Sequence, residues 1–300
     1  MTDDVENEVW KSKYLLMQHE WRCQQNTIGR LEIQTMKLQS QLKRQSQFCS
    51  RTGYILGYCL WKATQIPDVI NIILIKDKIL ELSEIMSGVL TSFNDTYQTK
   101  IPITDTEETR FVLSIIGLVA NLSTVDAGRK FFSQTNSGKN VIRLIVCILI
   151  RIPSPSANQL KKISYSALYN VSNYTVKTTS QIINAELVTV INNDIKDAAH
   201  TNIEPDLRYY ALKLLQSLIR NVCNKAAYDI LSNNIELSRL VNLASAVDVE
   251  TENISRNILD AFSKAKEQFE TKIPILCVHD IPCAIIANNK LFIFRNTVKI

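Results

Sequence analysis

Apolar residues spaced alternately four and three positions apart run from Trp10 for more than five heptads. Such spacing places them along one stripe of a helix, where a second helix can cover them. Polar residues interrupt the stripe at Gln24, Thr35 and Gln45, and such interruptions lower stability but can set register. We therefore predict a coiled-coil oligomerisation helix over residues 9–49, as a dimer or a higher oligomer, behind an acidic N-terminal end, residues 1–8. The alternative is a helix that packs on its own downstream domain. The apolar seam consists of Trp10, Tyr14, Met17, Trp21, Ile28, Leu31, Leu38 and Leu42.

From residue 50 onward a second pattern replaces the heptads. Residues 117–124, 166–173 and 217–224 are loose copies of one another, each ending a long run with helical periodicity, and residues 58–65 are a degenerate fourth copy. Self-similarity at roughly fifty residues is typical of stacked helical repeats, in which neighbouring units bury each other's apolar faces. Each unit reads as one short and two longer helices, which is the armadillo pattern; two-helix repeats of the HEAT type are the close alternative.

The expected helices follow this rhythm. Long helices are expected from residue 105 up to a break at Gly128, over 157–173 and over 204–221. Short helices are expected over 68–75, 129–134, 176–183 and 225–231, and further helices over 78–93, 139–152, 186–194, 237–246 and 250–269. We predict an all-α chain in which the N-terminal coiled-coil helix precedes an armadillo-like right-handed superhelix of about four repeats over residues 50–270.

The apolar tail, residues 271–300, departs from this rhythm. Residues 284–287 and 291–294 have β-like patterns joined by Asn288 and Asn289, which predicts a β-hairpin. A hairpin packed on the last repeat and sequence appended by an imperfect gene model both remain open.

Composition argues against several classes of protein. The hydrophobic content of 46% is enough for a core, and seven glycines and seven prolines are few for a sandwich or barrel. The seven cysteines include no CxxC pair, which fits a reducing compartment, and no secretory signal or bilayer-spanning run is evident. Three isolated histidines and no glycine-rich phosphate loop offer no catalytic or metal site, so we expect no enzyme activity and no cofactor.

A ladder of asparagines carries the functional prediction. One Asn recurs at the same place in each clear copy, and its carboxamide can hold both backbone groups of an extended peptide. The residue four positions earlier is small, which leaves room for a ligand on the same helix face. The alternative is that these Asn side chains cap or tie neighbouring repeats, and the two roles can coexist. The predicted groove residues are Asn121, Asn170 and Asn221, the small Gly117, Ser166 and Ser217, and the basic Lys62 and Arg129.

Two other functions compete with peptide binding. A nucleic-acid binder would use Lys37, Lys43, Arg44 and Arg51, but the net charge of +5 is spread without a polybasic block. An armadillo-type transport receptor would place a Trp beside each Asn, whereas Trp61 is the only Trp after residue 50.

Several segments together resemble the heat shock factor 2-binding protein family. They are residues 48–49, 60–61, 111–112, 128–131, 168–172 and 212–217, together with Gly117 and Asn121. The resemblance covers roughly residues 39–269. The chain departs from the family in a shorter coiled coil and in its apolar tail.

The resemblance implies a non-enzymatic, oligomeric armadillo domain behind a coiled coil. It also implies a role in meiotic double-strand-break repair, in the nucleus on meiotic chromosomes and in the cytoplasm. The implied partners are a peptide segment of the breast cancer type 2 susceptibility protein and a coiled-coil partner, either a meiotic cofactor or a heat shock factor. Arg129, Asn121 and Asn170 match the family's groove residues, and Asn221 matches less securely.

Overall fold

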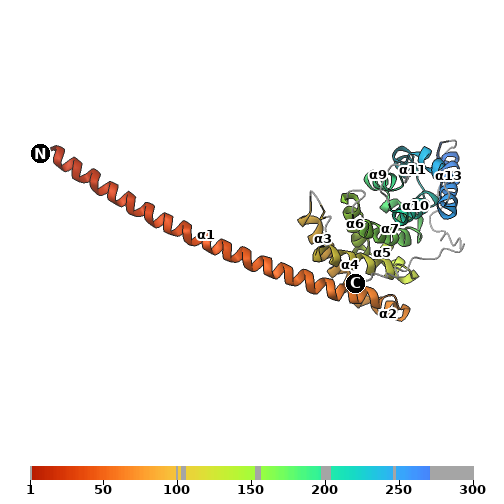
Figure 1. Cartoon of the computed structure of the whole chain (residues 1–300), viewed down its shortest axis with the longest axis horizontal. Coiled ribbons are helices and arrows are strands. Elements are labelled where there is room, and N and C mark those ends of the chain that lie inside the picture. The colour runs from red at the N-terminus through yellow and green to blue at the C-terminus, as the bar shows by residue number, and fades with distance from the viewer. Residues whose placement is uncertain are drawn as a thin grey trace. The chain divides into compact units, whose positions relative to one another are not determined.

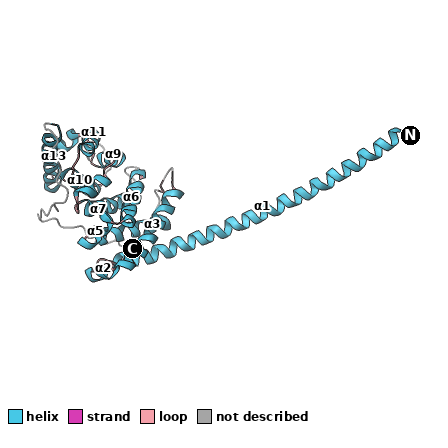
Figure 2. Ribbon diagram, turned by 180° about the vertical axis from the view of Figure 1, so that it is seen from behind, coloured by secondary structure: helices cyan, strands magenta, loops and turns pink. Residues whose placement is uncertain are grey.

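The structure is a computed structural model that describes residues 2–98, 101–102, 106–152, 157–196, 204–245 and 248–270. These residues form thirteen helices, and no strand occurs among them (Figure 2). The prediction of an all-α chain is therefore confirmed for the described part. The hairpin expected in the tail lies outside the described residues.

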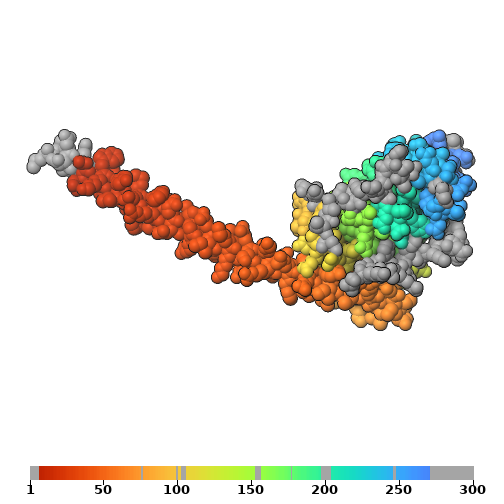
Figure 3. Space-filling model, viewed as in Figure 1, coloured from red at the N-terminus to blue at the C-terminus, as the bar shows by residue number. Residues whose placement is uncertain are grey.

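The chain divides into two compact units, Met1–Thr52 and Gly53–Ile300. Helix α1 (Thr2–Ala63) forms the first unit, and its last turns, from Gly53 onward, belong to the second. In the first unit the helix is single, and nearly all side chains of residues 7–49 are exposed, as the visible face shows (Figure 3). All eight apolar residues of the predicted seam are exposed, from 47% at Ile28 to 68% at Leu42. The domain boundaries at residues 8, 49 and 270 stay predictions.

The second unit repeats the order short helix, second helix, long third helix. The four repeats are α2 (Pro67–Ile73), α3 (Lys76–Thr96) and α4 (Glu107–Leu122); α5 (Asp126–Gln134), α6 (Asn136–Arg151) and α7 (Asn158–Ser172); α8 (Val176–Ile182), α9 (Ala185–Asp194) and α10 (Pro205–Arg220); and α11 (Lys225–Asn234), α12 (Leu237–Leu243) and α13 (Val249–Glu270). The end of α1 precedes them as an additional third helix. This is the armadillo-like arrangement that the sequence predicts.

Local sequence explains where many of these helices begin. Pro67 and Pro205 stand at the first positions of α2 and α10, where a missing N–H costs nothing. Side-chain caps start others: Thr135 accepts a hydrogen bond from the Gly138 amide at 3.0 Å, and Asn184 accepts one from the Leu187 amide at 2.7 Å. These caps satisfy backbone donors that the first turn of a helix leaves unpaired.

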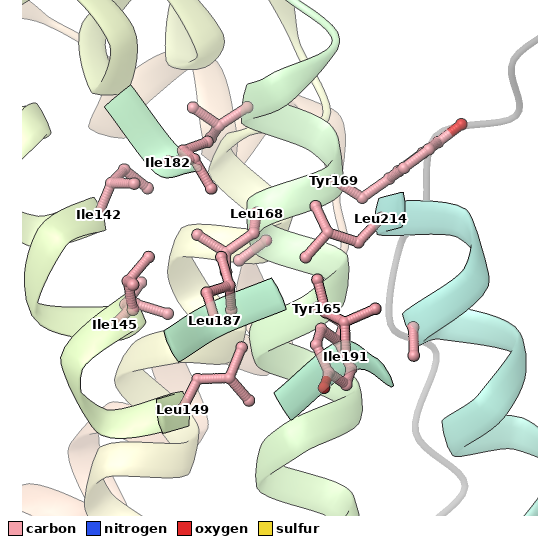
Figure 4. Packing of buried hydrophobic residues seen from close by; sticks show 14 of the residues in the cluster. Ile142, Ile145, Leu149, Tyr165, Leu168, Tyr169, Ile182, Leu187, Ile191 and Leu214 are labelled. Atoms are coloured by element: carbon pink, nitrogen blue, oxygen red, sulfur yellow. The ribbon is translucent and has the colours of Figure 1, made fainter. Parts of the chain in front are cut away.

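Equivalent helices of successive repeats pack on one another. Among the third helices, α4 packs on α7, α7 on α10 and α10 on α13; among the second helices, α3 packs on α6 and α6 on α9 (Figure 1). Between the two layers, Leu168 of α7 lies next to Leu187 of α9, in one hydrophobic cluster with Ile145 of α6 and Ile191 of α9 (Figure 4). Each repeat thus depends on its neighbours for its core, as expected of a solenoid.

The structure corrects one detail of the helix boundaries. Gly128 does not break the long helix, because α4 already ends at Leu122 and Gly128 lies inside α5. A Cβ atom at this position would lie 1.8 Å from the carbonyl oxygen of Leu122. Glycine is therefore required here so that α5 can approach the end of α4.

Candidate peptide-binding surface

The asparagine ladder lies between consecutive third helices. The Asn121 amide nitrogen donates to the carbonyl oxygen of Trp61 and to the hydroxyl of Thr64, both at 3.1 Å, and the side chain is completely buried. Trp61 lies in the last turn of α1, where helical carbonyls have no partner within the helix. Asn121 therefore caps the helix end of the preceding repeat.

Asn170 repeats this contact one repeat later. Its amide nitrogen donates to the carbonyl oxygen of Ala120 at 3.1 Å, and it too is completely buried. Asn221 differs: it follows the last residue of α10 and is partly exposed, and its amide lies 3.3 Å from the carbonyl oxygen of Ser172. The structure thus shows the alternative role, in which Asn ties repeats together. Direct peptide binding by these side chains stays a prediction.

The space expected for a ligand beside the Asn residues is filled by the protein itself. A Cβ atom at Gly117 would lie 2.2 Å from the indole ring of Trp61, so the glycine makes room for that ring. The Ser217 hydroxyl lies 2.6 Å from the hydroxyl of Ser172 on the preceding repeat. Ser166 is completely buried. The small residues therefore let repeats approach each other, and the expectation of ligand space beside them was wrong.

The two basic residues of the predicted groove hold local contacts. The Arg129 guanidinium donates to the carbonyl oxygen of Thr124 at 2.9 Å and pairs with the exposed carboxylate of Asp126. The Lys62 ammonium lies 5.4 Å from the ring centroid of Tyr58, within cation–π range. Arg129 is thus a turn-stabilising residue whose charge is partly neutralised, and its role toward a peptide stays a prediction.

Sequence reasoning missed a series of tyrosines, each close to a basic side chain, on the third helices. Arg110 of α4 lies 5.7 Å from the ring centroid of Tyr54 near the end of α1, and Lys213 of α10 lies 5.5 Å from that of Tyr209. A basic residue follows a tyrosine by four positions in two of these pairs, Tyr58 with Lys62 and Tyr209 with Lys213. Residues four apart are neighbours on a helix, so this spacing could have predicted the pairs from the sequence. Aromatic rings beside cations suit peptide recognition because they offer contact area and charge together.

Burial and charge shape the electrostatics of this surface. Burial raises the pKa of Tyr209 to about 12. Burial also raises the pKa of Tyr169, which the positive charge of Arg220 opposes. Tyr169 of α7 points toward α10, away from the core residue Leu168 (Figure 4). Tyr169 and Tyr209 therefore stay neutral hydrogen-bonding groups at ordinary pH, and the formal positive charge near them comes from the basic residues.

A buried ionic cluster lies outside this surface. The Lys161 ammonium donates to both carboxylate oxygens of Asp194 at 2.9 Å, and the Tyr165 hydroxyl donates to one of them at 2.7 Å. All three residues are completely buried. Burial lowers the pKa of Lys161, and Asp194 opposes this shift. The cluster ties α7 to α9 and has no access for a substrate.

Neither a metal site nor a single membrane span is found in the described part of the chain. No group of three His, Cys, Asp or Glu residues there could hold a metal ion. No single described helix is long and apolar enough to cross a membrane; α4 and α5 together meet that test but bend by 115° between them.

The sequence is similar to a curated protein. Over 142 residues it is 27% identical to the heat shock factor 2-binding protein of Mus musculus, which covers 47% of this chain and 41% of that protein. The chain thus matches less than half of the length of this relative. The resemblance drawn from the sequence segments is confirmed at this level, while no protein-family model matches the chain.

Among solved structures the likeness is weak. An engineered protein has a TM-score of 0.45 at 14% identity, over 72% of this chain and 92% of that one. A designed armadillo repeat protein has a TM-score of 0.38 at 12% identity, over 72% and 92%. A second designed armadillo repeat protein, solved with the peptide (KR)4, has a TM-score of 0.35 at 14% identity, over 68% and 98%. We therefore assign the fold from its own helix order and packing.

Proposed function

We propose that this chain is a non-enzymatic scaffold that binds an extended peptide along its third helices and self-associates through α1. The observation that carries the proposal is the series of tyrosines beside basic side chains on those helices, from Tyr54 with Arg110 to Tyr209 with Lys213. Because the helices stack directly, a peptide crossing them would meet the pair of Tyr54 and Arg110 at one end and the pair of Tyr209 and Lys213 further along. The buried Asn121 and Asn170 set the spacing of the helices in this mechanism.

The chemistry of the surface suggests an extended peptide with acidic or carbonyl-rich character. A net hydrogen bond contributes only about 0.5–1.5 kcal/mol, so a few such contacts alone would bind weakly. Self-association would present two surfaces at once, and bivalent binding can raise avidity by about 10²–10⁴.

The resemblance to the heat shock factor 2-binding protein family supports a more specific partner. On this basis the peptide is a segment of the breast cancer type 2 susceptibility protein, and the scaffold supports recombinase loading in meiotic double-strand-break repair. The same resemblance supports a location in the nucleus, on meiotic chromosomes, and in the cytoplasm. The relative's name describes binding to heat shock factor 2, and a protein of that class is a candidate partner for α1.

Overlapping synthetic peptides that tile the breast cancer type 2 susceptibility protein of the same species would test the peptide partner. Fluorescence anisotropy should find at least one that binds the full chain, and Arg110→Ala should weaken it severalfold. The matched control is Arg143→Ala, because Arg143 is also exposed but lies on the second helix α6. If no peptide binds the wild type, the proposed partner is wrong; equal weakening by both variants would remove the third-helix surface from the mechanism.

The seam of α1 supports self-association. In a parallel, in-register pair each seam residue faces its own copy, so Gln24, Thr35 and Gln45 form polar layers while the apolar residues are covered. Burying one apolar side chain contributes about 1.5–3 kcal/mol, so Leu38→Glu in both copies costs at least about 3–6 kcal/mol. This corresponds to an association constant lowered by a factor of about 100 or more.

Sedimentation of the full chain measures this effect. Leu38→Glu should shift the protein to the monomer, whereas Met36→Glu should leave assembly intact, because Met36 is also exposed but lies off the seam. A wild-type chain that is monomeric at high concentration would contradict self-association through α1.

A further inference from the structure

A polar cleft of about 280 Å³ lies between α10 and α13. On α10 it is lined by Tyr209, Lys213 and Arg220, which recur along one helix face, and on α13 by Glu250, Asn253 and Asn257. Both helices belong to the layer of third helices. The cleft is therefore positioned at one end of the surface to which we assign peptide binding.

The side chains that line the cleft are mostly hydrogen-bond donors. Lys213 offers three donors and Arg220 five, and each Asn amide offers two more. Glu250 is the one carboxylate among the lining residues and is exposed, so the formal charge of the lining is two positive against one negative. Such a lining favours an anionic group that can accept several hydrogen bonds.

The two cations of the cleft differ from several other basic residues of the repeats in their ion pairing. Among the described residues, neither Lys213 nor Arg220 forms an ion pair, although Lys161, Lys162 and Arg239 do. Lys213 is partly buried, and its ammonium lies 5.5 Å from the ring centroid of Tyr209. Burial lowers the pKa of Lys213 and the nearby Arg220 acts in the same direction, with Glu250 opposing. A bound anion would relieve the repulsion between the two cations.

We propose that the cleft between α10 and α13 binds an anionic group of the peptide partner, with Lys213 and Arg220 compensating its charge and Asn253 and Asn257 donating hydrogen bonds. The anion is a carboxylate, from an Asp or Glu side chain or a chain terminus, or the phosphate of a modified serine or threonine. This inference rests on the proposed peptide-binding function and adds a position-specific requirement for negative charge.

A displayed library of random peptides, selected on the full chain, provides the first test. Wild-type protein should enrich peptides with an acidic residue at one fixed position. The double variant Lys213→Met and Arg220→Met should still select peptides but without that acidic position. Lys264→Met is the matched control, because Lys264 is an exposed lysine of α13 paired with Asp260, and it should select the wild-type motif.

Synthetic versions of one enriched peptide then separate the sources of the anion. Replacing its acidic residue by Ser should weaken binding to the wild type by about tenfold but leave binding to the double variant nearly unchanged. Phosphoserine that binds more tightly than Glu assigns the cleft to phosphate, and the reverse order assigns it to a carboxylate. Glu250→Gln should strengthen binding of the acidic peptide, because it removes the one negative charge of the lining.

A peptide-free measurement distinguishes failure of the cleft from failure of the proposed function. Inorganic phosphate at tens of millimolar should raise the melting temperature of the wild type more than that of the double variant, relative to sodium chloride at equal ionic strength. The double variant and the control Lys264→Met should both retain the circular dichroism of the wild type, because Met preserves most of the aliphatic part of the replaced side chains. If no peptide is enriched but phosphate discriminates, the peptide function fails and the anion site stands. An unchanged acidic preference in the double variant, or equal phosphate effects, would overturn the anion site.

Discussion

Replacing Asn170 separates a structural role of the asparagine ladder from direct ligand binding. The side chain is completely buried, and its amide nitrogen donates to the carbonyl oxygen of Ala120 at 3.1 Å. Asn170→Ala removes this donor and leaves a small cavity. Asn170→Asp keeps the shape but places an oxygen opposite that carbonyl oxygen, so a hydrogen bond becomes a repulsion.

The structure sets the size of both effects. Loss of the hydrogen bond costs about 0.5–1.5 kcal/mol, and a cavity of about 40–60 Å³ adds roughly 1 kcal/mol. Two features reduce this loss of stability. The side-chain oxygen of Asn170 is buried without a hydrogen-bond partner, so removing it relieves a cost. The Ala120 carbonyl oxygen also keeps a second hydrogen bond, which the Ser123 hydroxyl donates at 2.9 Å. The net free-energy loss for Asn170→Ala is about 1–2 kcal/mol. Asn170→Asp buries an uncompensated charge and should cost about 3–5 kcal/mol.

Urea unfolding followed by circular dichroism measures these losses, and peptide anisotropy below the transition measures binding by the folded fraction. If Asn170 ties repeats together, Asn170→Ala lowers the unfolding midpoint while the folded protein binds peptide with nearly wild-type affinity. The opposite result, an unchanged midpoint with lost binding, would refute the structural role and make Asn170 a ligand contact.

Three further outcomes follow from buried or crowded groups. Asp194→Asn should lower the free energy of unfolding by about 3–5 kcal/mol in urea titrations, because it leaves the buried Lys161 ammonium unpaired. Gly128→Ala should cost about 3 kcal/mol or more by the same assay, because its Cβ would lie 1.8 Å from a backbone oxygen. Stability should fall as pH rises from 10 toward 12, because burial raises the pKa of Tyr97 and Tyr209 to about 12 from 10.0, and the unfolded chain releases these protons first.

Each of these outcomes has its own check. Gly88→Ala is the matched glycine control: no atom lies within 4 Å of its added Cβ, so it should stabilise α3 by up to about 1 kcal/mol. Replacing Lys161 by Met together with Asp194 by Leu should cost less than Asp194→Asn alone, and an equal cost would contradict the unpaired-charge explanation. The difference in alkaline absorbance between the wild type and Tyr209→Phe isolates the ionisation of Tyr209, which should occur only with unfolding; its ionisation near pH 10 in the folded protein would contradict the raised pKa.

The order and type of the elements could be predicted from the sequence because they depend on local periodicity and end signals. The heptad spacing from Trp10 predicts the exposed seam of α1, and the repeat of one short and two longer helices matches α2 through α10 closely. Helix starts are marked by prolines and by capping Thr and Asn residues, which act on backbone groups only a few positions away. A short segment of sequence is therefore enough to predict where such a helix begins.

Only the tertiary structure shows which groups the side chains of the asparagine ladder contact. A recurring Asn at helical spacing indicates a common face, but not whether that face meets a ligand or the preceding repeat. The partners of Asn121 and Asn170, the carbonyl groups of Trp61 and Ala120, come from fifty or sixty residues earlier in the chain. The Asn121 and Asn170 side chains reach these carbonyl groups only because the third helices pack directly on one another. Gly117 allows this packing because it leaves room for the Trp61 ring. Packing between distant segments, which local periodicity does not encode, therefore makes Asn121 and Asn170 ties between repeats, while their contact with a peptide stays a prediction.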